Sequence, residues 1–241
     1  MSDFGLTIII PVHNEEKRIS RCLKRTIEFC KSREWDYEII IVEDGSTDDT
    51  VKIAREFISK HNQIKLISNK KKEGKGGAIR RGFSAAEKKY VGYMDADLSA
   101  DPQEFERLLS FIDDFDIVIG SRILRGDLGA IKRPFTRSFF SRGYAILFRL
   151  LFRVEIHDPQ CGFKLFRARA AHSLFAQTET DGFAFDSEVL AKASISGMGI
   201  KEVPIIWEHD RSSKVCTLCE IRTMGRDLLS LWYRLKLSKR C

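Results

Sequence analysis

The sequence predicts an α/β fold in which a mostly parallel sheet is covered by helices on both faces. Short, almost fully apolar runs alternate with helical patterns through the first half of the chain, as expected for strands buried on both sides. The chain has 241 residues, of which 43% are hydrophobic. One domain of this size can therefore bury its own core without disulfides or a structural metal.

Five strands and four helices are predicted in the first half. The strands are short apolar runs at residues 6–12, 37–42, 64–68, 90–94 and 115–120. The segments between them carry apolar residues at helical spacing or helix-start signals, and they predict helices at 15–30, 51–58, 74–86 and from Asp101-Pro102 onward. The proline suits a first helical turn, because its missing N–H has no partner there in any case.

The pattern changes after Gly120. Residues 122–132 are predicted as a loop. The elements predicted beyond it are a basic amphipathic helix at 135–152, a strand at 161–166, a helix at 186–196, a strand at 200–207 and an amphipathic C-terminal helix at 221–237. The sequence contains no internal repeat and no Pro/Gly-rich linker, so one compact unit is predicted.

The positive charge is concentrated in one segment. The formal net charge of the chain is +7, and residues 122–153 contain eight basic residues and one acidic residue. Such a local excess indicates a partner such as phosphate, nucleic acid or an anionic membrane. No helix-turn-helix, zinc-finger or RNA-binding signature is present, so nucleic acid is not expected as a partner.

Acidic residues follow three of the predicted strands. Asp95 and Asp97 come directly after the strand at 90–94, while the segments 43–48 and 13–16 follow two earlier strands. Ligands of open α/β sheets bind outside the carboxyl ends of the strands. A pair of carboxylates there can share Mg²⁺ or Mn²⁺, which prefer oxygen ligands and leave positions for diphosphate oxygens. Each loop taken alone is better explained as a turn or a helix cap, and it is the combination of the three that favours a ligand site.

Together the motifs resemble a known family. The runs TIIIPVHNEE, YEIIIVEDGSTDDT, EGKGGAIRRG, YVGYMDADLSADPQE and DIVIGSR are similar in order and spacing to the family 2 glycosyltransferases of the GT-A fold. In the second half, DPQCGFKLFR, GFAFDSEV, VPIIWEHDRSSKV and MGRDLLSLWYR resemble the dolichyl-phosphate β-glucosyltransferases and, less closely, the dolichol-phosphate mannose synthases. The resemblance implies a Rossmann-like sheet in a single domain over residues 1–241. Residues 1–121 would bind the nucleotide sugar, and residues 122–241, with interfacial helices, would bind the acceptor.

The resemblance also implies roles for individual residues. The residues implied to be catalytic are Asp95 and Asp97, as metal ligands, and Arg122. The residues implied or expected to contact the nucleotide are Pro11, His13, Glu15, Asp44, Lys75 and Asp95. The residues implied to bind the acceptor phosphate or the donor are Arg122, Arg137, Ser141, Asp186, Arg211 and Lys214. Asp186 is expected to orient the donor sugar or to cap a helix. Ser99 departs from the mannose synthases, which carry Gln there as a third metal contact.

The activity implied is an inverting, metal-dependent transfer of a hexose, glucose from UDP-glucose, to polyprenyl or dolichyl phosphate. Such a phosphate is largely dianionic at neutral pH and needs no dedicated general base. Three alternatives remain open at this stage. They are GDP-mannose as donor, a sugar hydroxyl as acceptor with Asp186 or Glu188 as base, and a non-catalytic module that binds nucleotide or membrane.

A location on the cytoplasmic face of a membrane is expected, by peripheral attachment. No signal peptide is visible and no apolar run is long enough to span a bilayer. The six scattered cysteines fit reduced thiols, and Cys216 and Cys219 lack the second pair of ligands that zinc requires. In the basic helix, arginines stand beside Phe148, Phe152 and other apolar residues, which favours a membrane interface.

Overall fold

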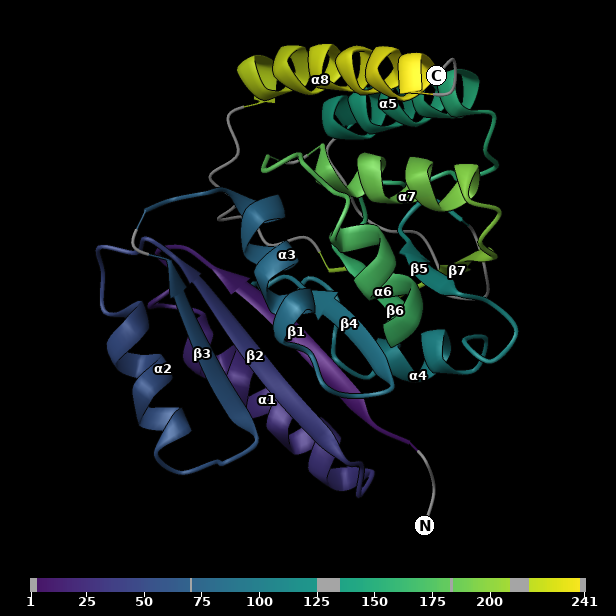
Figure 1. The fold of residues 1–241 in the computed structure, drawn as a ribbon. Helices are drawn as coiled ribbons and strands as arrows, with labels where there is room; N and C mark the ends of the chain where they lie inside the picture. The colour runs from purple at the N-terminus through teal and green to yellow at the C-terminus, as the bar shows by residue number, and fades with distance from the viewer. Residues whose placement is uncertain (1–3, 70, 125–134, 183, 209–216, 239–241) are drawn as a thin grey trace.

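The computed structural model describes residues 4–69, 71–124, 135–182, 184–208 and 217–238. Within these residues, seven strands form one sheet in the order β3-β2-β1-β4-β6-β5-β7 (Figure 1). The strands are β1 (Leu6–Val12), β2 (Tyr37–Asp44), β3 (Ile64–Asn69), β4 (Tyr90–Met94), β5 (Ile117–Ser121), β6 (Phe163–Arg167) and β7 (Ile200–Pro204). The predicted α/β fold with a mostly parallel sheet is confirmed.

One strand runs against the rest. The pairs β1–β2, β1–β4, β2–β3 and β5–β7 are parallel, whereas β6 is antiparallel to both β4 and β5. Because the other strands are parallel, the carboxyl ends of β1, β2 and β4 lie at the same edge of the sheet. The loops after these strands, which carry the predicted site residues, are thereby brought together.

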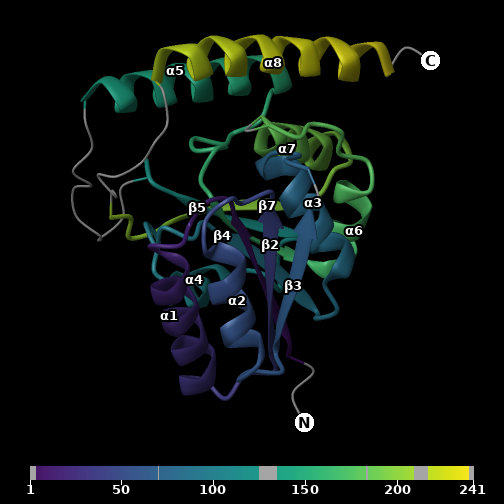
Figure 2. The same ribbon diagram turned by 90° about the vertical axis from the view of Figure 1, so that its left-hand side faces the viewer.

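Helices cover both faces of the sheet, each over its own apolar core (Figure 2). On one face lie α1 (Ile19–Ser32), α2 (Thr50–Ile58) and α4 (Glu104–Leu109). On the other face lie α3 (Lys75–Ala85), α6 (Ala168–Phe175) and α7 (Phe185–Ile195). Two long helices, α5 (Phe135–Phe152) and α8 (Thr217–Ser238), lie side by side beyond α7 as an outer layer.

Two sequence predictions are corrected, and one helix was not predicted. The helix expected from Asp101 begins at Glu104, because the Asp101 carboxylate accepts the N–H of Gln103 and holds a turn first. The strand expected at 200–207 ends at Pro204, where its partner strand β5 also ends. The helix α6 was not predicted, because its eight residues follow β6 directly and no capping residue marks its start. Its N-cap residue, Arg167, makes no side-chain capping hydrogen bond.

A buried carboxylate ties α7 to the segment before it. Glu188 is 1% exposed and accepts the N–H of Thr180 at 2.8 Å and the ammonium group of Lys192 at 2.7 Å. Burial by itself would raise the pKa of Glu188, but these hydrogen bonds outweigh burial and hold the pKa below its ordinary value of 4.5. Glu188 therefore has a structural role, and a role as general base is not supported.

Glu188→Gln should lower the free energy of unfolding at pH 7 by about 1.5–3 kcal/mol, the range for hydrogen bonds to a charged group. The folded-state pKa of Glu188 is lowered, so its contribution is complete above the unfolded value and disappears as the pH falls through the folded value. Urea unfolding at pH 7 and at stepwise lower pH should show the two proteins converging below about pH 4. Glu56→Gln, at an exposed position of α2, should leave stability unchanged. Equal effects of the two substitutions would contradict the assignment.

Candidate active site

Asp95 and Asp97 lie directly after β4, in a loop at the carboxyl edge of the sheet. Asp97 Oδ1 accepts a 2.9 Å hydrogen bond from the backbone N–H of Ser99, which holds the turn after the second carboxylate. Asp95 lies against Gly162, where an added Cβ atom would stand 2.2 Å from Asp95 Oδ2. The missing side chain at residue 162 therefore makes room for the first carboxylate.

The charges of this loop are partly balanced by a lysine. Burial and the neighbouring Asp95 carboxylate raise the pKa of Asp97. Lys75 Nζ, at the start of α3, lies 2.5 Å from Asp95 Oδ1. Burial would lower the pKa of Lys75, but attraction to Asp95 and Asp186 outweighs burial and raises it. The Lys75 ammonium group is therefore charged at neutral pH.

The two carboxylates suit a hard divalent cation. Mg²⁺ and Mn²⁺ prefer oxygen ligands, and Mg²⁺ keeps several positions for water or phosphate. In the part of the chain that the structure describes, no group of three or more His, Cys, Asp or Glu side chains is arranged to hold a metal ion. A cation here would have Asp95 and Asp97 as its protein carboxylates. Ser99, which stands where the mannose synthases carry Gln, is buried.

The structure brings the predicted nucleotide loops together. Pro11 lies in β1, and His13 Nδ1 donates to the backbone oxygen of Asp44 at 2.9 Å. The N–H of Glu15 donates to Thr50 Oγ1 at 2.8 Å, which joins the loop after β1 to the start of α2. These loops are thus held as one surface at the carboxyl edge of β1 and β2.

Asp44 holds the glycine-rich loop in place. Its carboxylate is buried and accepts the N–H groups of Glu73 and Gly74, each at 2.8 Å, and the side-chain amide of Asn69 at 3.0 Å. These bonds position the residues that directly precede Lys75. The contact of Asp44 with a nucleotide base stays a prediction.

Asp186 belongs to a buried network beneath the Asp95 loop. It is 4% exposed, its Oδ1 lies 2.5 Å from Lys164 Nζ, and it also accepts the hydroxyl of Tyr93. Lys164 is 1% exposed and also donates to the backbone oxygen of Cys161 at 2.6 Å. The expected capping role of Asp186 is wrong, because its described partners lie on the sheet and not at the start of α7. Its role in orienting a donor sugar stays a prediction.

Arg122 is held at the end of β5. Its guanidinium forms two hydrogen bonds of 2.7 Å with Asp158 and lies 5.1 Å from the ring centroid of Trp207. Burial opposes the charge of Arg122, but Asp158 outweighs burial and raises its pKa further. Arg122 follows β5 as Asp95 follows β4, and both strands end beside the start of β6, so the two residues lie at the same edge of the sheet. A fixed guanidinium in this place can receive an anion.

Sequence reasoning missed Lys164, Asp158 and Trp207. The signal for the first two was their presence in the motif DPQCGFKLFR, where an acid and a lysine stand in an otherwise largely apolar run.

The remaining predicted residues are only partly described. Ser141 is a half-buried residue of α5, and Arg137 lies on the same helix with a side chain outside the described part. Arg211, Lys214 and Cys216 lie outside the described residues, as does the side chain of Cys219. The assignment of these residues to an acceptor or diphosphate site stays a prediction.

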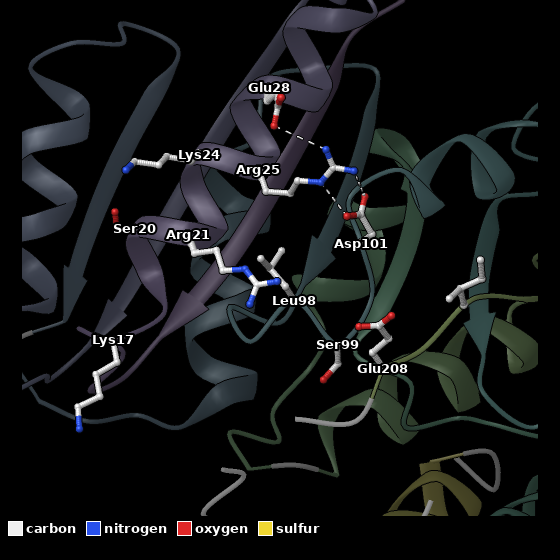
Figure 3. Close-up of a pocket in the computed structure, with 11 residues that line it drawn as sticks. Lys17, Ser20, Arg21, Lys24, Arg25, Glu28, Leu98, Ser99, Asp101 and Glu208 are labelled. Carbon is white, nitrogen blue, oxygen red and sulfur yellow. Dashed lines mark hydrogen bonds and ion pairs between the residues drawn. The ribbon is translucent and has the colours of Figure 1, made fainter. Parts of the chain in front are cut away.

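A groove of about 610 Å³ lies beside the carboxylate loop, between α1 and residues 98–101 (Figure 3). It is lined by Lys17, Ser20, Arg21, Lys24, Arg25, Glu28, Leu98, Ser99, Asp101, Ile206 and Glu208. Arg25 bridges to Asp101 across one end. Ser99 is shared with the loop that carries Asp97, but neither Asp95 nor Asp97 lines the groove, so it is separate from the predicted metal site.

The family model described as glycosyl transferase family 2 matches residues 7–175. The chain therefore belongs to this family and is a glycosyltransferase. A dolichyl-phosphate beta-glucosyltransferase of Dictyostelium discoideum is 34% identical over 243 residues, covering 95% of this chain and 74% of the relative. Relatives of the same name in Saccharomyces cerevisiae and Homo sapiens are 34% and 30% identical over 93% and 95% of this chain, and the matches cover 73% and 75% of those proteins.

Solved structures share the fold. Mannosyl-3-phosphoglycerate synthase from Rubrobacter xylanophilus has a TM-score of 0.75 at 15% identity, over 99% of this chain and 76% of that one. Glucosyl-3-phosphoglycerate synthase from Mycobacterium tuberculosis, in complex with Mn²⁺, uridine diphosphate and glucosyl-3-phosphoglycerate, has a TM-score of 0.68 at 18% identity, over 95% and 78%. The predicted GT-A fold is confirmed.

Gly162→Ala should lower the rate of glycosyl transfer by about a hundredfold, the cost of displacing a reacting group by roughly 1 Å. The new methyl group would stand against Asp95 Oδ2 and move that carboxylate. Steady-state kinetics with saturating donor would measure the loss, and circular dichroism would verify folding. Gly143→Ala is a matched control, because nothing lies within 4 Å of the added Cβ. An active Gly162→Ala protein would show that the position of Asp95 is not critical.

Proposed function

We propose that this glycosyltransferase transfers glucose from UDP-glucose to polyprenyl phosphate, such as dolichyl phosphate, with inversion and with a divalent metal ion. The observation that carries the proposal is the juxtaposition of opposite charges at one sheet edge. Asp95 and Asp97 follow β4 and Arg122 follows β5, and the ends of both strands pair with the first residues of β6, Met94 with Phe163 and Ile119 with Lys164. A metal-held donor and an anionic acceptor would therefore meet there. The names of the relatives, which span most of the chain, supply the sugar and the acceptor.

Asp95 and Asp97 would hold Mg²⁺ or Mn²⁺, which would neutralise the diphosphate leaving group. Lys75 adds a positive charge at the same place, and Arg122 would attract the acceptor phosphate. The second pKa of a phosphate monoester is near 6, so the acceptor is largely deprotonated at neutral pH and attacks without a base. Attack on the face opposite the leaving group gives a β-linked product from an α-linked donor.

A sugar hydroxyl as acceptor is supported less well. Such an acceptor requires a carboxylate that is free to take a proton. Asp186 is buried in an ion pair with Lys164, and Glu188 is bound to Thr180 and Lys192. An acceptor that arrives already ionised agrees better with these partners.

Attachment to the membrane that carries the acceptor is part of the proposal, at its cytoplasmic face. The outer helix pair exposes apolar side chains at helical spacing: Ile146 is 54% and Leu150 73% exposed on α5, and Leu229 is 50% and Tyr233 61% exposed on α8. Such a surface fits a lipid interface. Phe148, which the sequence placed on the membrane side, is instead buried in the core. Among the described residues, no helix is long and apolar enough to span a bilayer.

The reaction is tested with a panel of radiolabelled nucleotide sugars, dolichyl phosphate and Mn²⁺, by counting the label extracted into organic solvent. Label from UDP-glucose is expected, and EDTA should abolish it. Asp97→Asn should reduce transfer at least about a hundredfold, whereas Asp114→Asn, at an exposed residue, should not. If only GDP-mannose gave lipid-linked label, the donor would be GDP-mannose and not UDP-glucose. No lipid-linked label from any donor would refute the acceptor.

Membrane binding is tested by sedimentation with anionic phospholipid vesicles. Leu150→Glu and Tyr233→Glu should each weaken binding about tenfold or more, because each large apolar side chain that enters the interface contributes about 1.5–3 kcal/mol. Ile195→Glu, at an exposed apolar residue on α7, should not weaken it. Equal binding of all three variants would show that α5 and α8 do not contact the lipid.

A further inference from the structure

The backbone around Lys75 is held rigidly at the edge of the carboxylate loop. Gly74 has a φ of 97°, and the N–H of Gly76 donates to the backbone oxygen of Asp181 at 2.7 Å. An added Cβ at Gly74 or Gly76 would stand only 2.6 or 2.4 Å from backbone oxygens of the segment before α7. The start of α3 is thus clamped between this segment and the Asp44 carboxylate, which fixes the point from which the Lys75 side chain extends.

The positive charge of the Lys75 side chain faces the carboxylates of Asp95 and Asp97. Its ammonium group lies 2.5 Å from Asp95 Oδ1 and is also attracted by Asp97 and Asp186. The ion pairs of the neighbouring cations are with other acids, since Lys164 pairs with Asp186 and Arg122 with Asp158. Among the described residues, Lys75 is therefore the cation that balances Asp95.

We infer that the Lys75 ammonium group occupies the cation position at Asp95 when no metal is bound, and that a divalent metal ion must displace it. This inference rests on the proposed function, because it assumes that Asp95 and Asp97 hold the metal. A lysine suits the exchange, since its ammonium group is a compact charge on a flexible four-carbon stem. The diphosphate of the donor, which would lie at the metal, provides the displaced ammonium group with a new partner.

Two consequences of opposite sign follow. Without nucleotide, Lys75 competes with the metal, so its removal strengthens metal binding. With metal and nucleotide together, Lys75 contacts the diphosphate, so its removal weakens nucleotide binding. Metal and nucleotide should then promote each other's binding, and this coupling is reciprocal by linkage. A lysine that serves only as a permanent structural partner of Asp95 would not produce opposite signs.

The test consists of two measurements on the full chain. Electron paramagnetic resonance measures Mn²⁺ binding without nucleotide, and calorimetry measures UDP binding at saturating Mn²⁺. Lys75→Met should bind Mn²⁺ at least about tenfold more tightly than the unmodified protein, since one nearby unit charge is removed. The same variant should bind UDP more weakly. Lys75→Arg, which keeps the positive charge, should not bind Mn²⁺ more tightly. Lys71→Met, at an exposed position before α3, is the matched control for the loss of a positive charge.

The outcomes separate this inference from the proposed function. One outcome is that Asp97→Asn abolishes Mn²⁺ binding while Lys75→Met binds Mn²⁺ as the unmodified protein does, or more weakly. This outcome would overturn the displacement of Lys75 but would leave the metal site intact. Absence of Mn²⁺ binding by the unmodified protein, with or without UDP, would overturn the metal site and this inference together. Equally tighter Mn²⁺ binding by Lys75→Met and by the control Lys71→Met would show a general effect of net charge and would also overturn this inference.

Discussion

The antiparallel strand β6 is the constraint on which the rest of the structure depends. It pairs with β4 on one side and with β5 on the other, so it joins the first part of the sheet to the last two strands. Gly162, just before this strand, lies against Asp95, and Lys164 within it holds Asp186. A shift of one residue in a strand moves every side chain to the opposite face. The register of β6 therefore sets the position of the carboxylate loop and of the buried ion pair together.

Paired charges organise the site around this strand. A buried charge is tolerated only when a partner and further hydrogen bonds compensate its lost hydration. Lys164 has Asp186 and a backbone oxygen, and Arg122 has Asp158 and the ring of Trp207. Asp95 and Asp97 repel each other, and the ion pair at this place is the one between Lys75 Nζ and Asp95 Oδ1, at 2.5 Å. The edge of the sheet is thereby left with a place for added positive charge, which agrees with the proposed metal-dependent chemistry.

The outer helices α5 and α8 are packed onto the same body that carries the carboxylate loop. The helices α5 and α8 share one apolar core with α3, α6 and α7, through buried residues such as Phe148 and Leu231. The same two helices also carry apolar side chains that are exposed to solvent. The proposed donor site at the sheet edge and the proposed lipid-facing layer belong to one compact body, which suits the proposed reaction between a water-soluble donor and a lipid phosphate.

Much of this was available from the sequence alone. Apolar runs at 6–12 and 90–94 identify buried strands because a strand covered on both faces has few polar positions. The order of the motifs was enough to indicate the family and to name Asp95, Asp97 and Arg122. Only the tertiary structure decided what these residues touch. The direction of β6 depends on its pairing with β4 and β5, from much earlier in the chain. The pairing of Asp158 with Arg122, of Lys164 with Asp186 and of Lys75 with Asp95 joins residues from 20 to 36 positions apart. Local sequence patterns describe the backbone and the faces of single elements, whereas such contacts arise from how those elements pack.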